Sequence, residues 1–133
     1  MLRVIIGILY ILHGLVHLLY FGHSRRAFEM KPGMMWPDGT WVFSKFLETD
    51  VIRSIAGIAC VIAAAGFVAG GIGLLGKMQF WCPVTISAAV FSSILFILLW
   101  DGTFYNLDGQ GWVGVIINAM VLISIFVLKR PRI

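Results

Sequence analysis

The stretch LRVIIGILYILHGLVHLLYF, residues 2–21, decides how this chain is organised. Its length matches the roughly 20 apolar residues that a helix needs to cross a bilayer. At 100° per residue, Tyr10, His13, His17 and Tyr20 fall within about 80° of one another on a helical wheel. An unsatisfied polar group in hydrocarbon costs roughly 2–7 kcal/mol. The stretch therefore predicts a membrane-spanning helix whose polar stripe faces protein or trapped water.

The composition of the whole chain indicates an integral membrane protein. Of its 133 residues, 60% are hydrophobic and only 12% are charged, and the mean hydropathy is +0.98. A soluble domain averages about 25% charged residues. The net charge of +4 does not indicate a nucleic-acid partner, because Lys and Arg lie at segment ends and in loops. Cys60 and Cys82 lie inside apolar segments, where free, buried cysteines are expected.

Four apolar segments predict an all-α, integral membrane four-helix bundle that forms a single domain over residues 1–133. The expected helices cover about 2–21, 51–75, 80–100 and 112–129, each near the length of a membrane span. An even number of spans places both termini on one side. Lys and Arg divide five against five between the two sides, so their count does not decide the orientation. The short segments on the terminal side are purely basic, and we favour cytoplasmic termini in a bacterial or archaeal cell membrane.

The connection over residues 22–50 is long and rich in aromatic residues. It predicts a partly helical segment, with a short interfacial helix over 41–47 that Asp38 or Thr40 would cap. One interpretation is an aromatic belt that anchors the loop at the membrane surface. The other is a lid over the bundle.

The second apolar segment is rich in small residues and predicts the most tightly packed helix. Its pairs Gly66-x-x-x-Gly70 and Ala69-x-x-x-Gly73 let neighbouring backbones approach closely.

Polar residues from three segments are expected at one depth in the membrane. At a rise of 1.5 Å per residue, His13, His17, Ser92 and Asn118 lie about 6–12 Å below the side of the long connection. Asp101 and Arg53 would lie near the mouth of this layer. Intramembrane ionisable groups indicate a functional site by default. The candidate ligand-binding residues are therefore Tyr10, His13, His17, Arg53, Ser92, Asp101 and Asn118.

The two histidines leave three interpretations open. They can line a polar pocket for a lipid-soluble ligand or a proton. They can instead hydrogen-bond to other helices and only hold the bundle together. Histidines at i and i+4 can also share a metal, but no third ligand is obvious. Adjacent turns of one helix cannot supply both axial ligands of a haem, although a haem held by one histidine stays open.

Short motifs resemble those of DoxX-like proteins and of uncharacterised small four-helix bacterial membrane proteins. The first helix carries HGLVHLL at residues 13–19, the third segment ends in Trp100-Asp101, and the fourth holds Gly114-x-x-x-Asn118. The DoxX resemblance implies a quinone-facing membrane subunit linked to redox chemistry. The long connection over 22–50 departs from that pattern, and no residue here fixes a quinone.

We interpret the chain as a small membrane subunit with a histidine-lined pocket that binds a quinone or another lipid-soluble ligand. The alternatives are a structural or assembly protein and an oligomeric transporter or channel subunit. The expected partners are the lipid bilayer and either further copies of the chain or a larger membrane complex. No nucleophile motif, phosphate loop or carboxylate pair is visible, so the sequence leaves open whether the protein is an enzyme.

Overall fold

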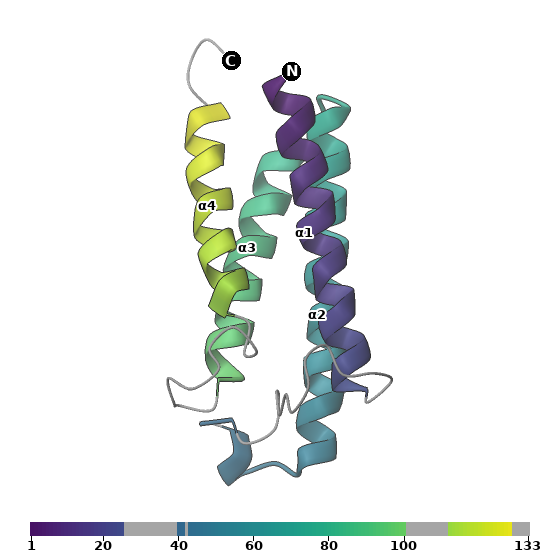
Figure 1. The fold of residues 1–133 in the computed structure, drawn as a ribbon, viewed down its shortest axis with the longest axis vertical. Helices are drawn as coiled ribbons and strands as arrows, with labels where there is room; N and C mark the ends of the chain where they lie inside the picture. The colour runs from purple at the N-terminus through teal and green to yellow at the C-terminus, as the bar shows by residue number, and fades with distance from the viewer. Residues whose placement is uncertain (26–39, 42, 101–111, 129–133) are drawn as a thin grey trace.

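The apolar segments form long helices in the computed structural model, which describes residues 1–25, 40–41, 43–100 and 112–128. Within these ranges the α-helices are α1 (Leu2–Ser24), α2 (Thr49–Leu75), α3 (Trp81–Leu98) and α4 (Trp112–Leu128), and no residue is in a strand. The helices run side by side along the long axis of the molecule (Figure 1). The predicted all-α bundle is confirmed.

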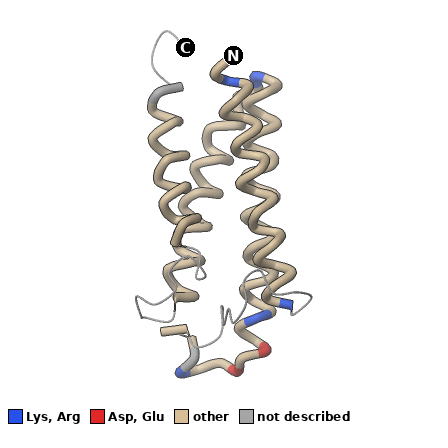
Figure 2. Tube along the Cα trace, viewed as in Figure 1, with Lys and Arg blue, Asp and Glu red and all other residues tan. Residues whose placement is uncertain are grey.

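The helices have the character of membrane spans. α1, α2 and α3 are each long and apolar enough to cross a bilayer, whereas α4 is apolar but shorter, at 17 residues. The described Lys, Arg, Asp and Glu residues lie at the two ends of the bundle, which leaves an uncharged middle (Figure 2). The start of α1 and the end of α4 lie at the same end (Figure 1). The chain is therefore a membrane protein by the length, composition and charge pattern of its helices.

α1 extends one turn beyond the predicted end at residue 21. The last carbonyl groups of a helix lack partners inside the helix. Here Arg53 Nη1 donates to the carbonyl oxygens of His23 and Ser24, at 3.2 and 3.1 Å. Ser24 itself is buried and lies close to Gly57 of α2. The added turn depends on contacts with α2, which a pattern within residues 2–21 cannot reveal.

The end of the long connection is fastened to α3. The predicted interfacial helix over 41–47 is wrong in length, because only the single 3₁₀ turn η1 (Phe43–Lys45) forms there. Thr40 is the cap, as one of the two predicted possibilities: its Oγ1 accepts the Phe43 N–H at 2.8 Å. Trp41 donates its indole N–H to the carbonyl of Ile97 at 2.7 Å. That carbonyl lies at the end of α3, which stops two residues earlier than predicted. Most of the predicted lid, residues 26–39, lies outside the described part of the chain.

Close packing along α2 is confirmed. Half of its most apolar window is buried, against 33% for α1 and 39% for α3. A Cβ atom on Gly66 would lie 2.9 Å from the Cβ of Ala88 in α3. On the other side, a Cβ atom on Gly71 would lie 2.7 Å from the carbonyl oxygen of Gly7 in α1. Small residues thus bring α2 against both neighbours.

The order of packing leaves one side of the bundle open. α1 packs on α2, α2 on α3 and α3 on α4, but α1 and α4 hardly touch. Figure 1 shows α4 standing apart from α1 along much of their length. In a closed bundle with this order of packing, the first and last helices would also pack on each other. Here α1 and α4 are joined instead by hydrogen bonds between polar side chains.

Candidate functional site

The polar stripe of α1 faces the interior, as predicted. Tyr10, His13, His17 and Tyr20 are 2%, 7%, 1% and 8% exposed. Residues on the other side of α1, such as Leu15 and Leu19, are 45% and 47% exposed. The stripe therefore brings both imidazoles into the bundle and leaves the apolar face for lipid.

His13 is joined to α4 and α3 through Asn118. Its Nε2 atom lies 2.7 Å from Oδ1 of Asn118, which is completely buried. The amide Nδ2 of Asn118 donates to Oγ of Ser93 at 3.1 Å. Because Oδ1 can only accept, His13 donates its Nε2 hydrogen to it. A chain of two hydrogen bonds thus links three helices at one depth.

His17 forms a second connection, from α1 to α3. Its Nδ1 atom lies 3.0 Å from the carbonyl oxygen of His13, and its Nε2 atom lies 2.7 Å from Oγ of Ser92. A carbonyl oxygen only accepts, so Nδ1 carries the hydrogen and Nε2 of the neutral ring accepts the Ser92 hydroxyl. Both nitrogens of His17 are therefore occupied within the protein.

Phe67 of α2 packs against both histidines, whose ring centroids are themselves 5.0 Å apart, and the sequence did not indicate it. Its ring centroid lies 4.6 Å from that of His13, in a T-shaped arrangement, and 5.3 Å from that of His17. Phe67 is fully buried. In the sequence it is one aromatic residue in an apolar run, and only a matching depth on α2 could have indicated it. It keeps both imidazoles in a dry environment and excludes a third polar partner on that side.

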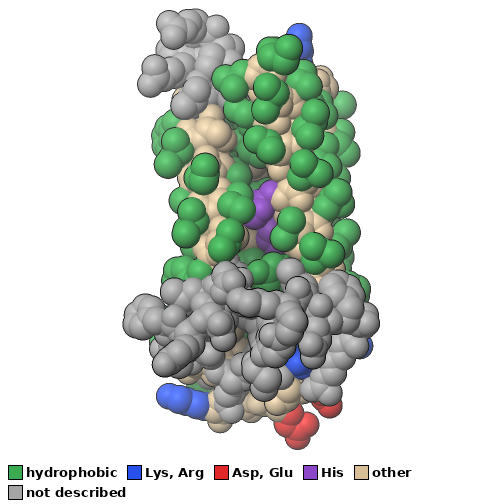
Figure 3. Space-filling view, viewed as in Figure 1, with side chains coloured by type: hydrophobic (Ala, Val, Ile, Leu, Met, Phe, Trp, Pro, Cys, Tyr) green, Lys and Arg blue, Asp and Glu red, His purple; other side chains and the backbone are tan. Residues whose placement is uncertain are grey.

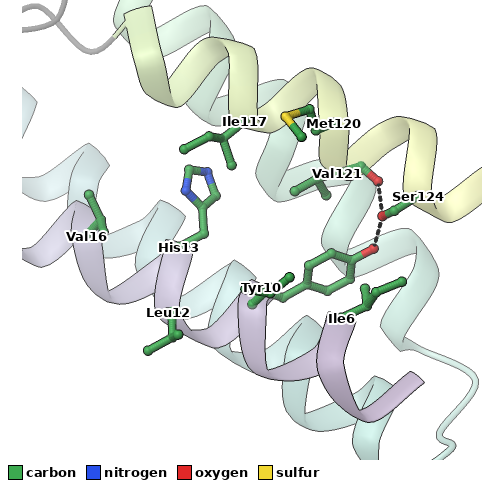
Figure 4. Close-up of a pocket in the computed structure, with 10 residues that line it drawn as sticks. Ile6, Tyr10, Leu12, His13, Val16, Ile117, Met120, Val121 and Ser124 are labelled. Atoms are coloured by element: carbon green, nitrogen blue, oxygen red, sulfur yellow. Dashed lines mark hydrogen bonds between the residues drawn. The ribbon is translucent and has the colours of Figure 1, made fainter. Parts of the chain in front are cut away.

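Tyr10 lies one turn before His13 and bonds to α4. Its hydroxyl lies 2.6 Å from Oγ of Ser124, and Ser124 donates to the carbonyl oxygen of Val121 at 2.6 Å. The single hydroxyl hydrogen of Ser124 is used in that bond, so Tyr10 is the donor to Ser124. Figure 4 shows this chain reaching from α1 to α4. Ser93 and Ser124 were not among the predicted site residues.

One other predicted site residue, Arg53, does not join this group. Arg53 lies in the first turns of α2, contacts the C-terminal end of α1 and lines a separate cavity of about 180 Å³ with Ser24, Arg25, Asp50 and Ser54. Asp101 lies outside the described residues. The structure therefore brings together Tyr10, His13, His17, Ser92 and Asn118, and their predicted role in ligand binding stays a prediction.

A groove of about 470 Å³ lies where α1 and α4 separate. Apolar side chains from both helices line it, together with Tyr10, His13 and Ser124. In the space-filling view, histidine is visible from outside between the two helices (Figure 3). Figure 4 shows the His13 ring projecting from α1 across this space toward α4. The groove thus connects the lipid-facing surface with a buried imidazole. Its lining residues are Ile6, Leu9, Tyr10, Leu12, His13, Val16, Ile117, Met120, Val121 and Ser124.

Few side chains near the two histidines could coordinate a metal or a haem iron. In the described ranges, no three His, Cys, Asp or Glu side chains gather in a metal-binding arrangement. His17 uses both of its nitrogens and His13 uses Nε2 in hydrogen bonds to the protein. Among the contacts of the described residues, Nδ1 of His13 is the one nitrogen of the pair that is not already bonded.

Comparisons with protein-family models, with curated proteins and with solved structures found no match. The resemblance to DoxX-like proteins stays a prediction.

Proposed function

We propose that the protein is a membrane subunit that binds a lipid-soluble molecule in the groove between α1 and α4. The observation that carries this proposal is a groove that opens toward lipid and has His13 in its wall. Its volume of about 470 Å³ falls in the range of small-molecule sites, roughly 300–1,000 Å³. A second cavity of about 420 Å³, between α2 and α3, has no histidine in its lining.

The lining supports entry of the ligand from the membrane. Leu9, Leu12 and Met120 line the groove and are 55%, 52% and 62% exposed, so its rim faces the acyl chains. An apolar tail would stay in contact with these residues, and a polar head group would reach His13. A quinone-type molecule has this shape, as do many lipids. The DoxX-like resemblance favours a redox-linked role within a larger membrane complex or an oligomer.

A structural role is the second candidate. His13 with Asn118 and His17 with Ser92 form buried hydrogen bonds between helices. Such bonds contribute about 0.6–2 kcal/mol each in membrane proteins. On this alternative the histidines hold α1 against α3 and α4, and the groove is a packing defect filled by lipid.

We place both termini on the cytoplasmic side of a bacterial or archaeal cell membrane. Arg3 and Lys77 are the described charged side chains at the terminal end, whereas Glu48 and Asp50 accompany the basic residues at the other end. The described charged side chains of the terminal end are thus all basic, and on this pattern we assign that end to the cytoplasm.

Filling the groove is expected to remove the bound molecule. Ile117 lines the groove on α4, and its replacement by tryptophan (Ile117→Trp) puts an indole into the space that a ligand would occupy. Protein purified in detergent would be extracted with organic solvent, and retained lipid-soluble compounds would be measured by mass spectrometry. We expect the variant to retain at least about tenfold less of the compound bound to the wild type, equivalent to about 1.4 kcal/mol of lost binding.

The neighbouring residue provides the matched control. Ile116 is 61% exposed and does not line the groove, so Ile116→Trp adds the same side chain to the same helix outside the site. We expect this variant to retain the compound at the wild-type level. Equal retention by all three proteins, or no retained compound in the wild type, would contradict ligand binding in the groove.

A further inference from the structure

The hydrogens of the polar side chains in the groove are all used within the protein. His13 donates its Nε2 hydrogen to Asn118, Tyr10 donates its hydroxyl hydrogen to Ser124, and Ser124 donates to the carbonyl oxygen of Val121. Each of these assignments follows from an acceptor that has no hydrogen to give, or from a hydroxyl whose single hydrogen is already donated. What these groups can still offer a ligand is lone pairs.

The strongest of these lone pairs is on Nδ1 of His13. Among the described residues, this atom has no hydrogen-bond partner, and it is not one of the unbonded polar atoms that are wholly enclosed. Only 7% of the His13 surface is exposed, and the residue lines the groove. Among the residues that the structure describes, no carboxylate lines the groove to balance a charged imidazole, and a buried charge without a partner is costly. The neutral ring with hydrogen on Nε2 has Nδ1 as an acceptor.

We propose that the groove selects a molecule whose head group carries a hydrogen-bond donor, which it gives to Nδ1 of His13. This inference rests on the proposed function, since it names the class of ligand for the same groove. The expected class is an apolar chain or ring system with a hydroxyl group, such as a phenol, a hydroquinone or a long-chain alcohol. The carbonyl oxygens of an oxidised quinone only accept hydrogen bonds, so of a quinone couple the reduced, hydroxylated form is the one that fits.

The network around Asn118 makes this selection possible. If the imidazole were held only by apolar neighbours, its hydrogen could move to Nδ1 and the same ring would serve either kind of head group. In the structure Asn118 turns Oδ1 toward His13 and donates through Nδ2 to Oγ of Ser93. Asn118 is thus the positioning residue, and His13 is the residue that touches the ligand.

Two probes that differ in one hydrogen-bond donor test the inference. In 4-decylphenol the hydroxyl can donate, whereas in 4-decylanisole a methyl group replaces that hydrogen. Wild-type protein in phosphatidylcholine nanodiscs would be equilibrated with each probe. The probe retained per protein, after subtraction of empty nanodiscs, would be measured by mass spectrometry. We expect the phenol to bind about five- to tenfold more tightly, the gain of one neutral hydrogen bond at a dry site.

His13→Phe supplies the variant that tests the named residue. Phenylalanine keeps a planar ring beside Phe67 but has no lone pair, so we expect it to bind the two probes about equally. The comparison within the wild type decides the inference even if this variant does not fold. Equal binding of both probes by the wild type, or preference for the anisole, would overturn the donor requirement while leaving ligand binding in place. Retention of neither probe above empty nanodiscs would overturn the proposed function together with this inference.

Discussion

Replacing Gly71 with alanine is expected to force α1 and α2 apart and to lower the free energy of unfolding by about 1–3 kcal/mol. A Cβ atom at this position would lie 2.7 Å from the carbonyl oxygen of Gly7 and 2.6 Å from Cγ1 of Ile11. The Ile11 side chain can rotate, but the carbonyl belongs to the backbone of α1 and can move only with the helix. Gly71→Leu should cost more still, because the added atoms have no space on either side of the Cβ.

Gly114→Ala provides the control for this change. Of the described atoms, a Cβ atom on Gly114 in α4 would meet only Cε2 of Phe96, at an ordinary contact distance of 3.8 Å. Alanine is favoured over glycine inside a helix by about 0.5–1 kcal/mol, so this variant should be at least as stable as the wild type. Stability would be measured as the midpoint of SDS-induced unfolding in mixed micelles, followed by circular dichroism. Equal midpoints for Gly71→Ala and the wild type would contradict the close approach of α1 and α2.

Removing Asn118 is expected to destabilise the protein by about 1–3 kcal/mol, because it leaves a buried donor without a partner. In Asn118→Leu, the Nε2 hydrogen of His13 loses the acceptor that lies 2.7 Å away, in a position with no access to water. The hydroxyl of Ser93 loses a donor as well. Ala119→Leu is the control, because Ala119 is exposed on α4 and its replacement removes no hydrogen bond. Its unfolding midpoint should stay near that of the wild type.

A double-mutant cycle then separates the cost of an unpaired group from the value of the pair. When both partners become apolar, the penalty for the unsatisfied donor disappears. The variant with both His13→Phe and Asn118→Leu should therefore be more stable than Asn118→Leu alone. We expect it to regain more than half of the unfolding free energy that Asn118→Leu loses. If the two changes are simply additive, the hydrogen bond between His13 and Asn118 is not formed in the membrane.

The cycle also bears on the choice between ligand binding and a structural role. If the histidines only join helices, a double variant that folds should bind the two probes as the wild type does. A protein with a binding site in the groove would fold in the double variant but lose its preference for the phenol probe. The double variant can therefore regain stability and still lose the phenol preference, and that combination indicates a binding site.

The layer of polar residues could be predicted because it depends on local rules. The spacing of Tyr10, His13 and His17 places them on one face of a helix, and counting residues from the helix ends places Ser92 and Asn118 at the same depth. The structure joins these residues in pairs, His13 with Asn118 and His17 with Ser92. Which serine meets which histidine could not be predicted, since it depends on how far each helix is rotated about its axis.

The groove could not be predicted for a related reason. In the sequence, Leu9, Leu12 and Met120 are indistinguishable from other lipid-facing residues of a membrane helix. They become the rim of a cavity only because α4 packs on α3 and stays away from α1. That separation depends on how all four helices pack together, which no single segment of the sequence reveals.

The sequence by itself determined that this is an all-helical membrane protein and that the histidines of α1 face inward, because apolar length and helical periodicity act within a single segment. Only the tertiary structure decided that α1 and α4 leave a groove between them, that Asn118 uses the Nε2 hydrogen of His13, and that Nδ1 remains for a partner. Hydrogen-bond partners across helices depend on rotation and separation, and these are decided by contacts such as that of Gly71 with Gly7.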